Sequence, residues 1–212
     1  MTDQVPRYQP EGRAAWRKWL RANHAKSSGV WLVFLKGPAR QMTYEAAVEE
    51  ALCFGWIDSL VRSIDEGSYM QLFTPRKPKS NWSALNKRRV ASLIARKLMT
   101  PAGLAKIEAA KKNGSWTKLD AVEAMTVPAD LARALAANTR AMAFFDAVAP
   151  SSRKGMLYWV NGVKSPELRA KRVAHVVSQC AKGLRPAHQE EWLAKTKASA
   201  KARKQPARGK LL

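Results

Sequence analysis

The sequence has few cysteines, histidines and acidic residues, and each shortage excludes a class of protein. Its two cysteines, Cys53 and Cys180, lack the paired spacing of a zinc site or a disulfide framework, so we expect two buried thiols in a reducing compartment. The three histidines, His24, His175 and His188, lie in different segments without ligand-like spacing. We therefore expect neither a metal nor a cofactor.

Long apolar runs and enzyme motifs are also missing. No segment has the apolar core of a secretory signal or approaches the roughly 20 apolar residues of a membrane span, so we expect no transmembrane segment and a cytoplasmic location. The sequence contains no GxSxG elbow, Walker loop, dinucleotide GxGxxG or HExxH. No enzyme class is indicated, and a non-enzymatic protein is favoured.

Positive charge is what the sequence has in excess. It contains 38 Lys and Arg against 16 Asp and Glu, a formal net charge of +22. This exceeds the few units that solubility needs, and such a surface attracts nucleic acid, acidic lipid or phosphorylated small molecules. With 212 residues and 46% apolar composition, the chain is also able to bury a core.

The N-terminal part mixes helical and strand-like patterns. Apolar residues at helical spacing predict a helix over 11–24, and an apolar run rich in β-branched and aromatic residues predicts a buried strand over 29–36. Thr43 is placed to cap a second helix that continues to about Phe54 and stops at Gly55. This part is therefore expected to be α+β.

Residues 55–77 fit either a helical face or a β-hairpin. The turn sequence DEGS and the strand-like SYMQLFT favour the hairpin. The turn sets a register that pairs Ile64 with Tyr69 and Leu60 with Phe73, and that places Asp58 beside Pro75 and Arg76.

The remaining pattern is almost wholly helical. A helix follows Ser80 or Asn81 as its N-cap, another covers 100–114, and further helices begin near Pro128, Asn138, Pro150 and Ser165. The pattern weakens over 115–128, so we divide the chain into an α+β domain (1–120), a helical domain (121–194) and a basic, disordered tail (195–212). The predicted fold class is α+β: a small antiparallel sheet with packed helices, followed by an all-helical C-terminal part.

Four motifs in succession carry a family resemblance: EEALCFGWIDS, FTPRKPKSNWSALNKRRV, MTPAGLAKIEAAKKNGSW and VPADLARALAANTRAMAFFDAVAPSSRKGMLYWV. Over roughly residues 10–185 the chain resembles the bacteriocin-protection, YdeI/OmpD-associated family. The resemblance implies a frataxin-like (YjbR/CyaY-like) N-terminal fold, protection against bacteriocins or cationic antimicrobial peptides, and an indirect envelope link. Iron binding by an acidic helix is not expected, because the corresponding helix offers only Glu45, Glu49 and Glu50.

The basic segment 73–90 supplies the first candidate site. Unsatisfied N–H groups at a helix N-terminus bind anions, and cations, hydroxyls and an indole beside them reinforce such a site. The candidate residues are Asp58, Arg62, Arg76, Lys79, Ser80, Trp82, Ser83, Asn86 and Arg89. In the alternative interpretation Ser80 only caps the helix, Asn86 only satisfies a backbone group, and Asp58 either orients Arg76 or acts as a general base.

The C-terminal helix supplies a second candidate, a basic patch. Leu168, Val173, Val176, Val177 and Cys180 are expected to face inward, with the cations on another side of the helix. The patch comprises Lys164, Lys171, Arg172, His175 and Lys182. It is either a solvated face or a surface for phosphates, which Lys and Arg contact without reading sequence.

Two functional hypotheses follow. In the first, the protein is a cytosolic, non-enzymatic binder of an anionic partner, nucleic acid or a phosphorylated ligand. In the second, a small-molecule or catalytic pocket lies between the 56–75 hairpin and the helix starting at Ser80.

Overall fold

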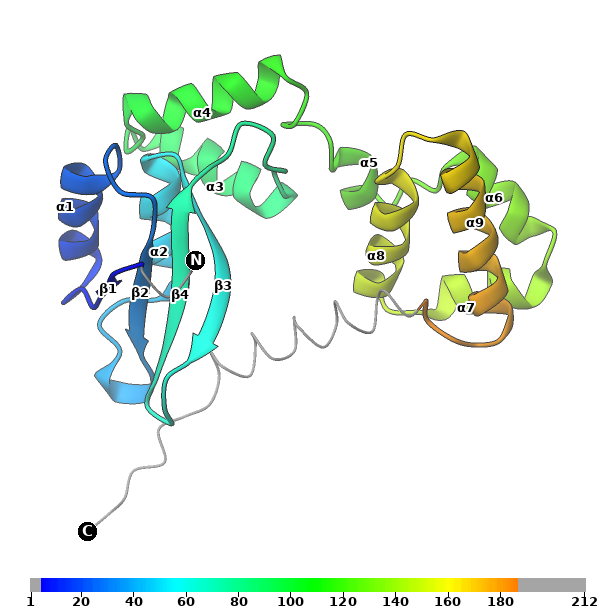
Figure 1. The fold of residues 1–212 in the computed structure, drawn as a ribbon, viewed down its shortest axis with the longest axis horizontal. Helices are drawn as coiled ribbons and strands as arrows, with labels where there is room; N and C mark the ends of the chain where they lie inside the picture. Colours follow the sequence, from blue (N-terminus) through cyan, green and yellow to red (C-terminus); the bar gives the residue numbers. More distant parts are fainter. Residues whose placement is uncertain (1–4, 187–212) are drawn as a thin grey trace, which may run out of the picture. The chain divides into compact units, whose positions relative to one another are not determined.

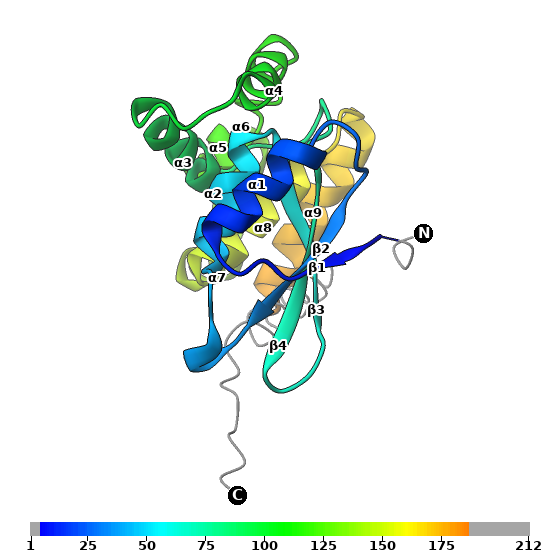
Figure 2. The same cartoon turned by 90° about the vertical axis from the view of Figure 1, so that its left-hand side faces the viewer.

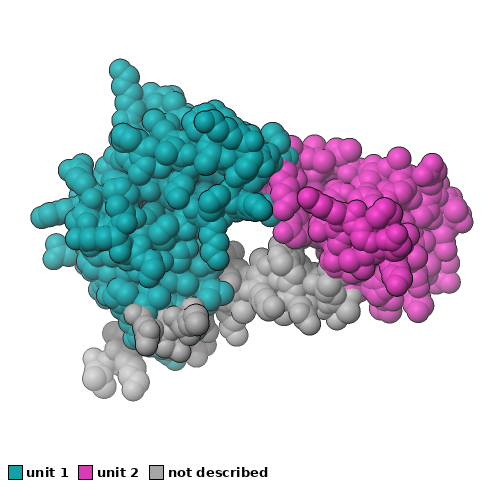
Figure 3. Space-filling model, turned by 45° about the horizontal axis from the view of Figure 1, so that its top comes forward, with its two compact units in different colours: residues 1–117, 197–212 teal, residues 118–196 magenta. Residues whose placement is uncertain are grey.

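The computed structural model describes residues 5–186, and these form two compact units that divide between Thr117 and Lys118 (Figures 1 and 3). The first unit holds a four-stranded sheet with helices, and the second is built from helices. The predicted α+β class with a helical C-terminal part is confirmed. The division lies close to the predicted boundary at 120/121, and the predicted tail, 195–212, lies outside the described residues.

The sheet is mixed rather than purely antiparallel. Its strands are β1 (Arg7–Tyr8), β2 (Val30–Leu35), β3 (Trp56–Ser63) and β4 (Ser68–Pro75), in the order β1-β2-β4-β3. The predicted strand and hairpin form the antiparallel part, but β1 pairs parallel with β2. A strand of two residues carries no periodicity, so the sequence pattern did not reveal it.

The predicted hairpin register is wrong. Ser63, not Ile64, pairs with Tyr69, and a β-bulge between Asp58 and Val61 then shifts the pairing by one more residue. Asp58 therefore lies opposite Phe73 instead of beside Pro75 and Arg76. An extra residue in one strand also exchanges the faces that later side chains occupy, and only the paired strands show where this happens.

Helices α1 (Arg13–Asn23) and α2 (Tyr44–Cys53) pack on one face of the sheet (Figures 1 and 2). Between β2 and α2 lies a 3-10 turn, Gly37–Ala39. As predicted, Thr43 Oγ1 caps α2 by accepting a hydrogen bond from the Ala46 backbone N–H at 3.1 Å. Gly55 follows the helix with a φ of +73°, a left-handed conformation that glycine adopts without strain.

Helices α3 (Ala84–Ala95) and α4 (Pro101–Lys112) complete the first unit. α4 approaches α2 closely at Gly103, where a Cβ atom would lie only 2.3 Å from the Cys53 carbonyl oxygen. The same carbonyl accepts a hydrogen bond from Thr100 Oγ1 at 2.7 Å. Glycine at 103 therefore permits the helix contact, and Thr100 fixes it.

The core of the first unit contains large aromatic side chains and one buried acid. Trp16 and Trp56 are buried between the helices and the sheet, and the Trp16 indole donates to the Ala47 carbonyl at 3.1 Å. Glu50 is 3% exposed, and its two carboxylate oxygens accept hydrogen bonds from Arg13 at 2.6 Å and Arg17 at 2.5 Å. Because a buried charge needs partners, this acid is structural.

The second unit consists of short helices around a separate core. They are α5 (Asp120–Glu123), α6 (Ala129–Ala136), α7 (Thr139–Ala147), α8 (Pro150–Asn161) and α9 (Pro166–Ala181). The last four begin where the capping signals predicted. Buried side chains from all five helices, including Leu131, Phe145, Met156 and Val176, form the core. Over residues 5–186, no helix has the length and apolar character needed to cross a lipid bilayer.

Candidate functional site

The segment between β4 and α3 was the first predicted site, and its capping residue differs from the prediction. α3 begins at Ala84, and Ser83 Oγ accepts the Asn86 backbone N–H at 3.2 Å as its N-cap. Neither Ser80 nor Asn81, the two predicted caps, is the N-cap, and Ser80 lies in a turn where its N–H donates to the Lys77 carbonyl at 3.0 Å. Serine is a preferred N-cap residue at either position, so the sequence alone does not distinguish Ser80 from Ser83, and the backbone of the structure does.

Arg76 is the most unusual side chain in this segment. It is 3% exposed, its guanidinium carbon lies 3.7 Å from the centre of the Trp82 ring, and its Nη1 donates to the Asn81 carbonyl at 2.8 Å. Burial lowers the pKa of Arg76 to about 10, and the negative charge of Asp58 opposes that shift. Within the described chain, the buried Arg76 Nε and Trp82 Nε1 have no hydrogen-bond acceptor.

Asp58, on β3, belongs to a cluster of hydrogen-bonded polar side chains. Its Oδ2 accepts hydrogen bonds from the Tyr44 hydroxyl at 2.7 Å and from the Gln71 side-chain amide at 3.2 Å. Gln71 is fully buried at the centre of β4 and also donates to the Ser59 carbonyl at 3.1 Å. Gln71 was not predicted as part of a site, although a polar residue at the inward position between Tyr69 and Phe73 was a signal.

The other residues of the first candidate set are not gathered at one point. Arg62 lies beyond the bulge on the opposite face of the sheet, with its guanidinium 4.8 Å from the centre of the Trp31 ring. Arg89 donates to Asn86 Oδ1 at 3.1 Å along α3, and Lys79 is exposed. The structure therefore brings Arg76 to Trp82 and Ser83 to Asn86, but it separates Arg62 from both.

The basic patch on α9 borders a cavity of about 420 Å³. The residues that line it are Trp159, Leu168, Lys171, Arg172 and His175. Three of these, Lys171, Arg172 and His175, belong to the predicted patch, whereas Lys164 and Lys182 do not line the cavity. The volume falls within the range of about 300–1,000 Å³ that is common for small-molecule sites.

Two side chains of the cavity were not predicted in it. Trp159 comes from α8 rather than α9, and a single helical pattern does not reveal which residues of a neighbouring helix adjoin it. Leu168 was predicted to face inward but is 43% exposed, because it lies in the first turn of α9, ahead of the buried Val173, Val176 and Cys180. Both add apolar surface next to the cations.

Arg172 and Arg169 hold the C-terminal end of α8. Arg172 Nη1 donates to the Trp159 carbonyl at 2.5 Å, and Arg169 Nη1 donates to the Val160 carbonyl at 3.3 Å. Cations stabilise a helix C-terminus because the last carbonyls lack partners within the helix. Arg169 also bonds Asp130, and that hydrogen bond is the main reason why the pKa of Asp130 is below its ordinary value.

A second cavity, of about 580 Å³, lies in the first unit. Its lining residues are Arg7, Gln9, Val33, Leu35, Lys36, Ala39, Ile64, Asp65, Gly67 and Ser68. The charged groups here already serve the hairpin turn: Lys36 Nζ donates to the Asp65 carbonyl at 3.3 Å, and Asp65 Oδ1 accepts from the Ser68 hydroxyl at 2.8 Å. Lys36 and Asp65 are therefore engaged in holding the hairpin turn.

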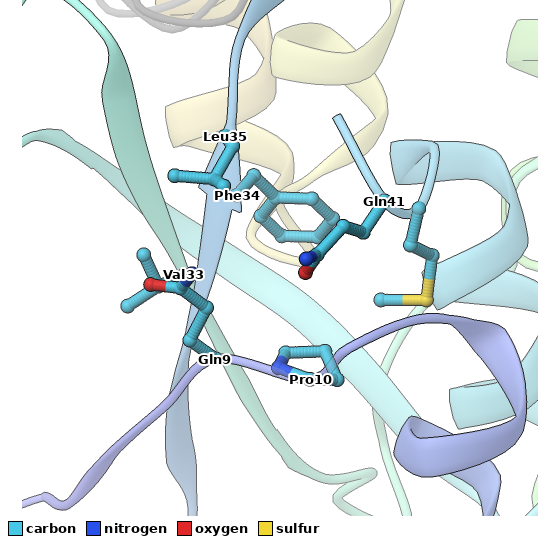
Figure 4. Close-up of a pocket in the computed structure, with 7 residues that line it drawn as sticks. Gln9, Pro10, Val33, Phe34, Leu35 and Gln41 are labelled. Carbon is cyan, nitrogen blue, oxygen red and sulfur yellow. The ribbon is translucent and has the colours of Figure 1, made fainter. Parts of the chain in front are cut away.

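The third cavity is too small for a ligand. It has a volume of about 10 Å³ and is lined by Gln9, Pro10, Val33, Phe34, Leu35, Gln41 and Met42 (Figure 4). Such a space holds about one water molecule. Elsewhere in residues 5–186, no group of three or more His, Cys, Asp or Glu side chains is placed to hold a metal ion.

Comparisons with known proteins divide the chain in a similar way. Residues 8–106 match the model of a domain of unknown function (DUF8412), and residues 124–183 match the model described as bacteriocin-protection, YdeI or OmpD-associated. Comparison with curated proteins and with solved structures gave no match. The second match covers α6 to α9 and the α9 cavity. Over its helical unit, the chain therefore resembles the bacteriocin-protection, YdeI or OmpD-associated family, as predicted, whereas the predicted extent of about residues 10–185 exceeds this match and the N-terminal part matches a different model.

Proposed function

We propose that this protein is a non-enzymatic binder of an anionic partner, and that nucleic acid is the leading class of partner. The observation that carries the proposal is the α9 cavity, where Lys171, Arg172 and His175 adjoin the indole of Trp159. No acidic side chain is among the residues that line it. The cavity thus combines positive charge with an aromatic surface in a protein whose net charge is +22.

The engagement of nearby acids supports the proposal. In the second unit, Asp130 pairs with Arg169 at 2.5 Å and Glu123 pairs with Lys154 at 2.6 Å. These two pairs use cations outside the cavity lining, so Lys171 and Arg172 are not neutralised by them. Phosphate contacts from such residues position a nucleic acid without reading its sequence.

Family resemblance adds a physiological role to the proposal, protection against bacteriocins or cationic antimicrobial peptides. A protein with a net charge of +22 repels a cationic peptide, so we propose that protection is indirect, for instance by covering an anionic target that the peptide would occupy. A tight direct complex with a cationic peptide, measured by calorimetry, would contradict this part of the proposal.

The proposed location is the cytoplasm. Cys53 and Cys180 are both buried free thiols, which agrees with a reducing compartment. Cell fractionation tests this, and recovery of the protein outside the cytoplasm would contradict it. The second functional hypothesis, a small-molecule or catalytic pocket between the 56–75 hairpin and α3, stays a prediction, because none of the three cavities described above lies there.

Charge reversal at the cavity tests the binding site. Lys171→Glu should weaken binding of a labelled mixed DNA and RNA pool at least tenfold, because it removes one phosphate contact and adds repulsion. Arg140→Glu is the matched control: Arg140 is exposed on α7, does not line the cavity, and its reversal changes the net charge equally. Equal weakening by both variants, measured by fluorescence anisotropy, would rule out a site at α9.

A further inference from the structure

We infer that the α9 cavity accepts an unpaired base of a single-stranded nucleic acid, while the adjoining phosphates contact Lys171 and Arg172. This inference rests on the proposed function, since it names the form of nucleic acid that the same site would bind. The observation that supports it is the set of planar side chains at the cavity, rather than the positive charge there.

The cavity contains three planar side chains in contact. The His175 ring lies 5.5 Å from the Trp159 ring, at 64° to it, and the Arg172 guanidinium carbon lies 4.7 Å from the centre of the same indole. Aromatic rings and guanidinium planes are the surfaces on which proteins stack unpaired bases. A base that enters the cavity therefore meets stacking surfaces from both α8 and α9.

Arg172 is oriented before any ligand binds. Its hydrogen bond to the Trp159 carbonyl, at 2.5 Å, ties the guanidinium to the helix that carries the indole. Less side-chain freedom is then lost on binding, which favours affinity. The remaining donors of this guanidinium and the exposed ammonium of Lys171 lie at the same cavity and suit the phosphates on either side of the base.

The apolar part of the lining favours a base over a phosphate inside the cavity. Leu168 is 43% exposed there, and the long stems of Lys171 and Arg172 add apolar surface below their charged ends. A phosphate alone gains nothing from such a surface, whereas a base buries its face against it. In a duplex that face is already stacked on its neighbours, so duplex nucleic acid is limited to phosphate contacts at the rim.

The test separates base contacts from phosphate contacts. A labelled single-stranded oligonucleotide, a strand of the same length that lacks bases, and the corresponding duplex are titrated against the full chain by fluorescence anisotropy. Stacking of one base predicts that the complete strand binds roughly fivefold to 150-fold more tightly than the baseless strand. It also predicts tighter binding of the single strand than of the duplex when the two are compared at equal phosphate concentration. A mononucleotide serves as a fourth ligand and should bind weakly.

Two neighbouring aromatic residues provide a matched pair of variants. Trp159→Leu should remove the advantage of the complete strand over the baseless strand but leave the salt dependence of binding unchanged. Tyr158→Leu is the control, since Tyr158 is 50% exposed on the same helix but does not line the cavity. Circular dichroism verifies folding, and His175→Ala, at an exposed position, replaces Trp159→Leu if that variant unfolds.

The contrary results distinguish a failure of this inference from a failure of the proposed function. Equal affinity for complete and baseless strands in the unchanged protein overturns the inference but leaves the proposed function standing. Equally tight binding of the mononucleotide also overturns it, in favour of a free nucleotide as the ligand. No salt-sensitive binding of any of the three polymers at low salt contradicts the proposed function itself.

Discussion

Asp130 and Arg169 show what single charges contribute in the second unit. Arg169 donates to both carboxylate oxygens of Asp130, from Nε at 2.5 Å and from Nη2 at 3.0 Å, and so links the start of α6 to α9. This bidentate contact lowers the pKa of Asp130. A lowered pKa means that the folded state favours the ionised carboxylate, so the pair stabilises the fold at neutral pH.

The pair predicts a pH-dependent loss of stability. At pH 7, Asp130→Asn should lower the free energy of unfolding by about 0.5 kcal/mol, the size expected of a pair screened by solvent. The difference from the unchanged protein should disappear as pH falls through the lowered pKa of Asp130, because the carboxylate is then protonated. Calorimetric unfolding between pH 7 and pH 2.5 measures this. Asp146→Asn is the control, and a difference for Asp130→Asn that persists at the lowest pH would contradict the account.

Individual residues were predicted unevenly. Thr43 as a cap and Gly55 as a stop follow from local chemistry, which the sequence displays directly. The burial of Arg76 does not follow from local chemistry. A cation in a basic segment is expected at the surface, and only the structure shows that Arg76 packs against the Trp82 ring. Trp159 was missed as a cavity residue for a similar reason: its partners, Arg172 and His175, belong to another helix.

At the level of elements, α3 offers a direct comparison between the predicted and the observed cap. Ser83→Ala should lower the free energy of unfolding by about 1 kcal/mol, because the Asn86 N–H loses its acceptor. Ser80→Ala should change it by less than about 0.5 kcal/mol, since the only bond described for Ser80 uses its backbone N–H. Urea denaturation of both variants measures the difference. An equal or larger effect at Ser80 would contradict the assigned helix start.

Elements were more predictable than their pairing. The helix starts at Pro150 and Ser165 and the β3–β4 turn each have a local signal, and the structure contains them. The predicted hairpin register was wrong by one residue at the turn and by one more at the bulge between Asp58 and Val61, which no glycine or proline marks in the sequence. The shift of one residue at the turn and the bulge together moved Asp58 to Phe73, and the bulge placed Asp58 and Arg62 on opposite faces of the sheet, so the residues of the first candidate site are separated.

At the scale of the whole molecule, the two compact units use their cationic side chains differently. The N-terminal unit uses its buried acid, Glu50, to hold Arg13 and Arg17, while in the C-terminal unit Lys171 and Arg172 adjoin an aromatic cavity. The sequence predicted both the net charge and the stripe of cations on α9. It did not predict a cavity there, because the volume depends on how α8 and α9 pack.

The salt dependence of binding tests the central claim most directly. The observed association constant of the full chain for a mixed DNA and RNA pool is measured from about 50 mM to 0.5 M salt. If the cations of the α9 cavity neutralise two or more phosphates of a single strand, the constant should fall about sevenfold or more between about 50 and 200 mM, because condensed counterions are released. Affinity that is retained to about 0.5 M salt, or no binding at the lowest salt, would contradict the account.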